Sequence, residues 1–338
     1  MNIRIISFTD RGQALSQTLA ASLSDHLVQQ YAKAAGFLPY ASVRTFAEEG
    51  MAQADLLVFI GAAGIAVRAI APFVCSKDTD PAVLVIDENG KYVISLLSGH
   101  IGGANAWAQR LADTLHAIPV ITTATDGRGV FAVDSWGVRH DCSVKDIQEI
   151  KHVSGALLRR EQVGLCSDFP ICGALPDGVQ LDASQDCGIL ISIREPKQAP
   201  FVHTVQLVPH IVHVGVGCKK QTDPCALRMW ADSILQKLHI VPQAVASVSS
   251  IDLKKEEPAV LELAKSWRVH TQFYSAQELE QVKGEFPPSA FVRSITGTDN
   301  VCQRAAAKAS ENGRCLLAKT AQDGMTISIY EKEWRAEF

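Results

Sequence analysis

The sequence predicts an α/β protein in which two parallel-sheet α/β domains are joined by a smaller middle α/β domain. Two observations carry this prediction. Short apolar runs without polar alternation, such as residues 55–60 (DLLVFI) and 211–217 (IVHVGVG), are typical of strands that are buried on both faces of a sheet. Segments with apolar residues at helical spacing separate these runs, and that alternation favours parallel sheets covered by helices.

The first domain is expected over residues 1–135. Leu15, Leu19, Leu23 and Leu27 recur at helical intervals and predict a helix over residues 12–29. Strands are expected at residues 1–8, 55–60, 81–86, 92–97 and 119–123, and a second helix at 102–116. We therefore expect a largely parallel sheet in this domain.

The middle domain is expected over residues 136–209 and the C-terminal domain over 210–338. In the middle domain, a helix is expected at 145–160 and strands at 163–167 and 188–193. In the C-terminal domain, Asp223 and Pro224 fit the N-cap and first position of a helix that ends near residue 238. Further strands are expected at 211–217, 243–251, 314–319 and 325–330, and further helices at 256–267, 277–282 and 301–310.

The composition excludes several function classes. The 338 residues include 32 Lys plus Arg and 36 Asp plus Glu, a net charge of −4, which does not favour binding to nucleic acid or to an anionic membrane. No stretch reaches the length of a membrane span and the first residues do not form a signal peptide, so we expect a cytoplasmic protein. The 9 cysteines are odd in number and include no C-x-x-C, which favours reduced, structural thiols.

Several catalytic motifs are absent from the sequence, namely the P-loop, H-E-x-x-H and G-x-S-x-G. Gly215 and Gly217 begin like a dinucleotide-binding fingerprint, but Lys220 stands where the third glycine belongs, so NAD is not predicted. A strand, a glycine turn and a helix start beside Lys219 and Lys220 suit a carboxylate or phosphate. A tight turn with solvated lysines explains the same residues equally well.

Three histidines gather near the start of the C-terminal domain, at His203, His210 and His213. They straddle two strands, and no carboxylate or cysteine stands at a ligand spacing from them. We expect structural histidines here and no metal site.

The segment 95–105 (SLLSGHIGGAN) places His100 at the end of a buried strand, followed by paired glycines. Residues 61–64 (GAAG), followed by Arg68, stand at a second strand end, and residues 122–126 (TTATD) follow a third. Ligands of open α/β sheets bind at the carboxyl ends of strands, so we expect the three ends to converge on one crevice. The alternative is that His100 only caps or packs.

These segments carry a resemblance to a known family. Residues 61–105 and 119–126 (PVITTATD) resemble the cobalt-precorrin-5A hydrolase family of anaerobic cobalamin biosynthesis. The C-terminal region resembles the same family through VGVGCKKQT, SSIDLKKEE, SITGTDNVCQRAA and LLAKTAQDGMTISIY, so the similarity covers residues 55–140 and 211–330. Lys219 and Lys220 replace expected arginines, which keeps the charge but loses bidentate geometry.

The resemblance implies a reaction. Water opens a δ-lactone on a cobalt corrinoid precursor, and acetaldehyde leaves to give cobalt-precorrin-5B, so the implied enzyme is a hydrolase acting on a carbon–carbon bond. It implies no cofactor and no protein-bound metal, because the substrate carries the cobalt. The implied partner is the corrinoid, without nucleic acid or membrane; a homodimer and handover to other enzymes of the pathway stay open. The alternative function is a non-catalytic corrinoid-binding or carrier protein, since the C-terminal region also resembles small stand-alone proteins of the aerobic route.

The strand-end positions and the resemblance together define the candidate site. His100 is the expected general base or acid, and Asp126 is the second candidate for proton transfer, although it also suits a cap or turn. The expected substrate-binding residues are Gly61, Gly64, Arg68, Lys77, Gly99, Gly102, Gly103, Asn105, Gly217, Lys219, Lys220 and Lys319. We expect both terminal domains to contribute to one substrate cleft, because a tetrapyrrole is too wide for one strand-end crevice.

Overall fold

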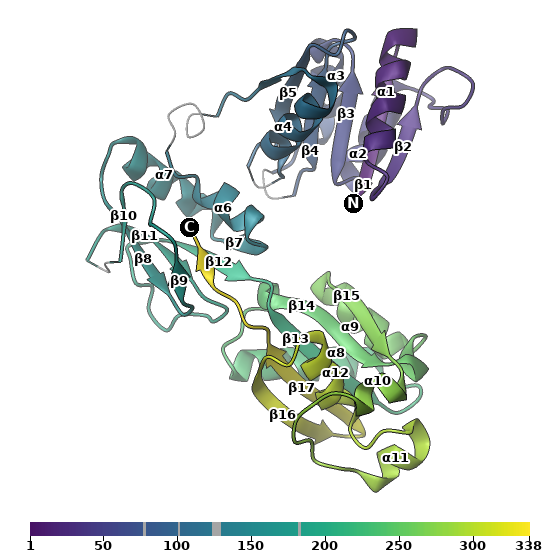
Figure 1. Cartoon of the computed structure of the whole chain (residues 1–338), viewed down its shortest axis with the longest axis vertical. Helices are drawn as coiled ribbons and strands as arrows, with labels where there is room; N and C mark the ends of the chain where they lie inside the picture. The colour runs from purple at the N-terminus through teal and green to yellow at the C-terminus, as the bar shows by residue number, and fades with distance from the viewer. Residues whose placement is uncertain (77–78, 101, 124–129, 182–183) are drawn as a thin grey trace. The chain divides into compact units, whose positions relative to one another are not determined.

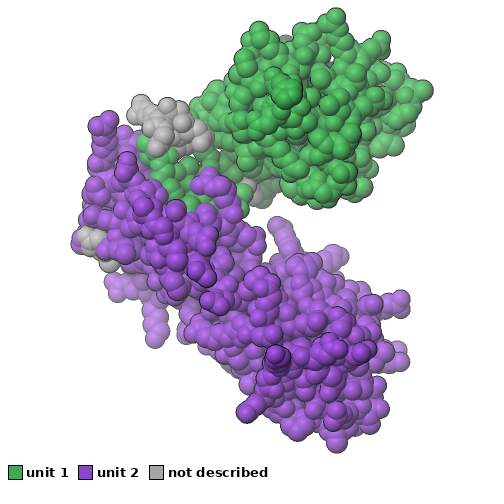
Figure 2. Space-filling view, in the orientation of Figure 1, with its two compact units in different colours: residues 1–138 green, residues 139–338 purple. Residues whose placement is uncertain are grey.

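The structure is a computed structural model that describes residues 1–76, 79–100, 102–123, 130–181 and 184–338. The chain forms two compact units, Met1–Val138 and Arg139–Phe338 (Figure 2). Each unit contains mixed sheets flanked by helices, which confirms the α/β class (Figure 1). No helix in the described part of the chain is long and apolar enough to cross a membrane.

Unit 1 is built on a six-stranded sheet in the order β2-β1-β3-β4-β5-β6. Its strands are β1 (Asn2–Ser7), β2 (Leu27–Tyr31), β3 (Leu56–Ile60), β4 (Ala82–Ile86), β5 (Tyr92–Leu97) and β6 (Ile118–Val120). Its helical segments are α1 (Asp10–Ser22), α2 (Val43–Gln53), α3 (Ala63–Ile70), η1 (Ala71–Phe73), α4 (Ala104–Leu115) and, at the unit boundary, α6 (Val133–Arg139). The predicted first domain boundary, after residue 135, falls within α6.

The predicted helix over residues 12–29 is too long. Helix α1 ends at Ser22, and Leu27 instead begins β2, which pairs in parallel with β1. Leu27 fits the helical spacing of the preceding leucines, so pairing with β1 overrode the local pattern.

Two apolar layers enclose the sheet of unit 1. On one face, Leu19 of α1 and Leu111 of α4 pack with Ile3 and Ile5 of β1. On the other face, the buried side chains of α2 and α3 pack with the alternate strand residues, such as Phe59 of β3. The continuous apolar runs in the sequence are therefore explained by a sheet that is covered on both faces.

The direction of β5 determines where the candidate site residues lie. Strands β1 to β4 are parallel to one another, but β5 is antiparallel to β4, with Val83 opposite Leu97 and Ile86 opposite Val93. Strand β6 is parallel to β5. The carboxyl ends of β5 and β6 thus lie on the same side of the sheet as the beginnings of β3 and β4. We call each of the two sides formed by strand ends an edge of the sheet.

The first sheet of unit 2 has five strands in the order β10-β8-β11-β12-β7. Its elements are β7 (Cys142–Lys145), η2 (Ile147–Glu149), α7 (Ile150–Leu158), β8 (Val163–Ser167), β10 (Val179–Gln180), β11 (Cys187–Ile191) and β12 (His203–Pro209). The helix predicted at 145–160 begins later than expected, because residues up to Lys145 pair antiparallel with β12. Strand β12 was not predicted.

The second five-stranded sheet of unit 2 has the order β15-β14-β13-β17-β16. Its strands are β13 (Val212–Cys218), β14 (Val245–Ile251), β15 (His270–Tyr274), β16 (Arg314–Gln322) and β17 (Met325–Glu331). Its helical segments are α8 (Pro224–Lys237), η3 (Pro242–Ala244), η4 (Asp252–Lys254), α9 (Pro258–Trp267), α10 (Ala276–Glu280), α11 (Ala290–Thr296) and α12 (Val301–Ala309). Strands β9 (Ile171–Cys172) and β18 (Ala336–Glu337) form a separate two-stranded sheet.

Two local expectations in this sheet have different outcomes. Asp223 is the N-cap of α8 and Pro224 its first residue, as predicted, and the Asp223 side chain accepts from the N–H of Cys225. The expected strand at 211–217 is confirmed, but it continues through Cys218, so the turn starts at Lys219 and not at Gly215 or Gly217. A Cβ at Gly215 would lie 1.8 Å from a carbonyl oxygen of α12, so this glycine permits direct packing of helix on strand.

All nine cysteines are free thiols in the structure. This agrees with the expectation of reduced cysteines.

Candidate functional site

The segment around His100 forms a tight turn between β5 and α4. Strand β5 ends at Leu97, and Gly103, with φ of 80°, is the N-cap of α4. The N–H of Gly103 donates to the carbonyl of His100 at 2.9 Å, and the N–H of Ala104 donates to the carbonyl of Ser98 at 3.1 Å. These bonds fix His100 at the sheet edge where β5 ends.

His100 contacts a pair of polar residues on α6. Its Nδ1 lies 2.5 Å from Oγ of Ser135 and 4.0 Å from Oδ1 of Asp134. The His100 and Asp134 side chains are 16% and 10% exposed, so solvent screens this interaction only in part. Both neighbours face Nδ1, which differs from a Ser-His-Asp triad, where the serine and the acid face opposite ring nitrogens.

Asn105 connects the carboxyl ends of β5 and β6. The hydroxyl of Ser95 donates to Oδ1 of Asn105 at 2.7 Å, and Nδ2 of Asn105 donates to Oγ1 of Thr123 at 3.1 Å. The structure therefore brings together two of the three strand ends that the sequence singled out.

The third strand end lies elsewhere, so the expected convergence of all three is wrong. The N–H of Gly61 donates to the carbonyl of Ile86, which places Gly61 where β3 and β4 end. Because β5 is antiparallel to β4, this edge is about 15 Å from the His100 edge, the length of a five-residue strand. Gly64 and Arg68 follow on α3; Arg68 is exposed and its Nη1 donates to the carbonyl of Gly64 at 3.4 Å.

Two candidate residues, Lys77 and Asp126, lie outside the described residues. The C-terminal candidates lie in unit 2. Cys218 of β13 and Gln322 of β16 both pair with Met325, so Gly217 and Lys219 lie at that end of the sheet, with Lys220 in the adjoining turn. Lys319 lies further inside the sheet, three residues before Gln322 within β16.

The three histidines named in the sequence have separate environments. His213 is buried, its Nδ1 lies 2.8 Å from Oγ of Ser247, and burial lowers its pKa to about 4. His210 lies 2.8 Å from Oδ1 of Asp141. His203 does have a carboxylate neighbour, contrary to the spacing argument, because Glu149 lies 54 residues away in sequence but 2.8 Å away in space.

Sequence reasoning missed Ser135 and Asp134. Ser135 is 35 residues from His100 and belongs to no motif, so only the fold reveals the contact. The nearest sequence signal was a polar pair beside the apolar residues Val133 and Trp136.

Comparison with known proteins covers most of the chain. The family models described as "Cobalamin synthesis G N-terminal", "Cobalamin biosynthesis central region" and "Cobalamin synthesis G C-terminus" match residues 45–126, 131–209 and 212–330. A cobalt-precorrin-5A hydrolase of Salmonella typhimurium is 35% identical over 342 residues, which is 97% of each chain. A cobalt-precorrin-5A hydrolase of Priestia megaterium is 31% identical over 81% of this chain and 77% of its own.

A solved structure also resembles the chain. The crystal structure of a putative cobalamin biosynthesis protein G homolog from Sulfolobus solfataricus has a TM-score of 0.41 and 23% sequence identity, and the match covers 98% of this chain and 97% of that one.

Proposed function

The chain belongs to the cobalt-precorrin-5A hydrolase family, and from this premise we propose that it hydrolyses the δ-lactone of cobalt-precorrin-5A and releases acetaldehyde to give cobalt-precorrin-5B. Identity of 35% over nearly the whole of both chains supports this assignment. The proposed reaction therefore ends with cleavage of a carbon–carbon bond.

The reaction divides into two balanced steps. In the first, water attacks the lactone carbonyl, a base accepts a proton, and the acyl C–O bond breaks to give a carboxylate and a hydroxyl. In the second, the hydroxyl loses its proton and the adjacent C–C bond breaks, which releases acetaldehyde. The bonding electron pair passes to the macrocycle, which then takes up a proton. The protein must supply a base and donors for the tetrahedral oxyanion.

We assign the base to His100, and its contact with α6 is the observation that carries this assignment. Asp134 lies 4.0 Å from Nδ1, and a nearby negative charge favours the tautomer that carries its proton there. In that tautomer Nδ1 donates to Ser135, and the lone pair on Nε2 is the base. The same carboxylate stabilises the imidazolium that forms when His100 accepts a proton.

The turn beside His100 is the proposed source of oxyanion donors. The N–H of Gly103 is committed to the carbonyl of His100, which leaves Gly99 and Gly102 as the candidate donors, with Asn105 beside them. Asp126 stays the second candidate for proton transfer.

We propose that the basic candidates bind the peripheral carboxylates of the substrate. They are Arg68 and Lys77 in unit 1, and Lys219, Lys220 and Lys319 in unit 2. Gly61, Gly64 and Gly217 stay candidates for substrate contact beside them. The shared substrate cleft, a homodimer, handover to other enzymes and a cytoplasmic location stay predictions. We propose that the reaction needs no resident cofactor, because cobalt enters within the substrate.

The direct test is incubation of the protein with cobalt-precorrin-5A, followed by measurement of acetaldehyde and of the ring-opened corrinoid. We expect many equivalents of acetaldehyde per protein, equal to the substrate consumed. Tight stoichiometric binding without acetaldehyde would instead assign the protein as a corrinoid carrier.

A further inference from the structure

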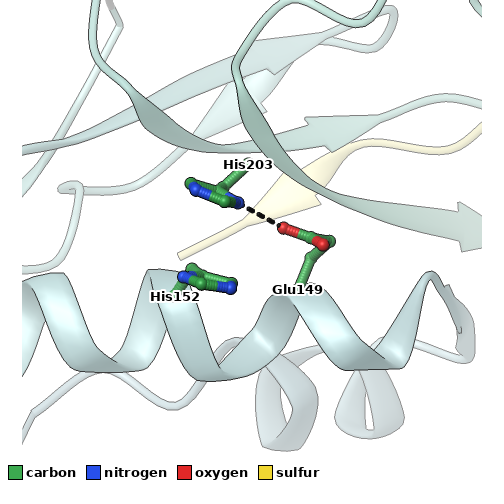
Figure 3. Close-up of side chains that lie close together, drawn as sticks. All are labelled: Glu149, His152 and His203. Atoms are coloured by element: carbon green, nitrogen blue, oxygen red, sulfur yellow. Dashed lines mark hydrogen bonds and ion pairs between the residues drawn. The ribbon is translucent and has the colours of Figure 1, made fainter.

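A cluster of potential metal ligands lies in the first sheet of unit 2, on elements that the proposed reaction does not use. Glu149 ends η2 and His152 lies three residues later on α7, so both side chains share one face of the helix (Figure 3). His203, the first residue of β12, faces them. Its Nδ1 lies 2.8 Å from Oε2 of Glu149, and its ring stacks on that of His152 with centroids 3.8 Å apart.

The cluster borders an open cavity of about 400 Å³. His152 and His203 line this cavity together with Asp186 and Cys187. Cys187 is the strand neighbour of His203 in the β11–β12 pair, so the two side chains project from the same face of the sheet. Burial, together with the charge of Asp186, raises the pKa of the Cys187 thiol.

The donor set has a definite chemical preference. Two imidazoles and one carboxylate are the ligands of open zinc sites, whereas calcium and magnesium take oxygen ligands. One ligand atom from each of the three residues lies within 4.8 Å of the others. Ligands of a tetrahedral ion at 2.0–2.1 Å are about 3.4 Å apart, so binding would draw these atoms together by at most about 1.4 Å.

The stacking of the two rings sets a condition for metal binding. An imidazole directs its lone pair in the plane of its ring, and the two rings are only 10° from parallel. One ring must therefore rotate before both nitrogens can face a common ion. The side chains of His203 and Glu149 are 36% and 31% exposed, which leaves room for this rotation.

We propose that Glu149, His152 and His203 form a binding site for a divalent first-row transition-metal ion such as Zn²⁺. The fourth coordination position is left to water from the open cavity; Asp186 and Cys187 line this cavity but do not belong to the three-residue group. This proposal reverses the expectation of no metal site that the spacing of His203, His210 and His213 had suggested. It is independent of the lactone reaction, because none of these residues belongs to the His100 edge.

The test is calorimetric titration of the full-length, EDTA-treated protein with ZnCl₂. We expect one saturable site in the wild type. His152→Ala, His203→Ala and Glu149→Gln should each weaken the affinity by at least about tenfold, because even partners of a ligand change metal affinity by about 10- to 100-fold. His270→Ala removes an exposed histidine from β15 and serves as the matched control, with wild-type affinity.

Two further measurements keep the result decisive. Thermal unfolding without metal shows which variants fold, and Zn²⁺ should raise the Tm of the wild type and of His270→Ala by more than that of the folded cluster variants. Titration with Co²⁺ should give visible absorption bands that disappear in the same variants. Absence of a saturable site in the wild type would overturn the proposal, as would unchanged affinity in all the cluster variants, which would assign the zinc to exposed thiols such as Cys225.

Discussion

The two edges of the unit 1 sheet present the same local pattern but different chemistry. At each edge a strand ends, a glycine turn follows and a helix begins, although β3 is fully buried and β5 only partly so. At the Gly61 edge a Cβ on Gly61 would lie 2.9 Å from the ring of Phe8, and the exposed side chains of the following helix α3 include Ile65, Val67 and Arg68. At the His100 edge, Ser135 and Asp134 surround an imidazole.

This difference teaches that a strand–glycine–helix pattern does not by itself locate a catalytic site. Strand direction decides which edge each turn occupies, and the side chains brought there decide the chemistry. We therefore expect proton transfer at the His100 edge, and we expect Arg68, which follows the opposite edge, to contribute only to binding.

The largest expected difference between the edges comes from a pair of glycine substitutions. In Gly102→Val, the Cβ would lie 2.4 Å from Cβ of Ser98 and 2.9 Å from its carbonyl oxygen, so the turn must shift. If the shifted turn costs transition-state stabilisation of the size of typical overpacking, about 1–3 kcal/mol, kcat/KM should fall roughly 5- to 160-fold. Gly64→Ala is the matched control, because its Cβ would meet only Arg68 at 3.4 Å. Equal losses in the two variants would contradict the assignment of the edges.

Asn105→Ala tests the connection between β5 and β6. The substitution removes the bonds to Ser95 and Thr123 and leaves both hydroxyls without this partner. We expect a loss of about 2 kcal/mol in the free energy of unfolding, measured by urea denaturation. An unchanged free energy of unfolding would show that the hydrogen bonds of Asn105 do not stabilise the fold.

Asp134→Asn removes the charge near His100 and keeps the side-chain shape. Loss of an ion pair worth about 1 kcal/mol predicts a roughly fivefold decrease in kcat with little change in KM. A change confined to KM would mean that Asp134 contacts substrate and does not orient His100.

Arg68→Ala should have the smallest effect. Arg68 is exposed, and a solvent-screened pair with a substrate carboxylate contributes at most about 1 kcal/mol. We expect KM to rise by no more than about fivefold, with kcat unchanged. A large loss of kcat would place Arg68 at the reacting atoms and make the two edges functionally equivalent.

The elements that depend on local sequence signals, such as apolar spacing and capping residues, were predicted from the sequence. The α8 cap at Asp223 and Pro224 and nearly all strands of unit 1 follow from spacing and propensity. The direction of β5 was also foreseeable, because residues 87–91 contain Asn89-Gly90, a hairpin-turn signal, and a parallel crossover needs a dozen or more residues.

Contacts between distant segments could not be predicted in this way. Ser135 reaches His100 across 35 residues, and Glu149 reaches His203 across 54. Neither pair has a spacing signal, because α6 and η2 are positioned by tertiary packing. The sequence could therefore name His100 as a candidate base, but it could not reveal the contacts of His100 with α6.

The central claim is that His100 acts in proton transfer at its edge of the sheet. The most direct measurement is the rate of acetaldehyde release by His100→Asn under saturating cobalt-precorrin-5A, with substrate affinity measured in parallel by fluorescence quenching. The account predicts a decrease in turnover of about 10²-fold or more with folding and affinity retained. Turnover near the wild-type rate in the folded variant would contradict it and remove His100 from the mechanism.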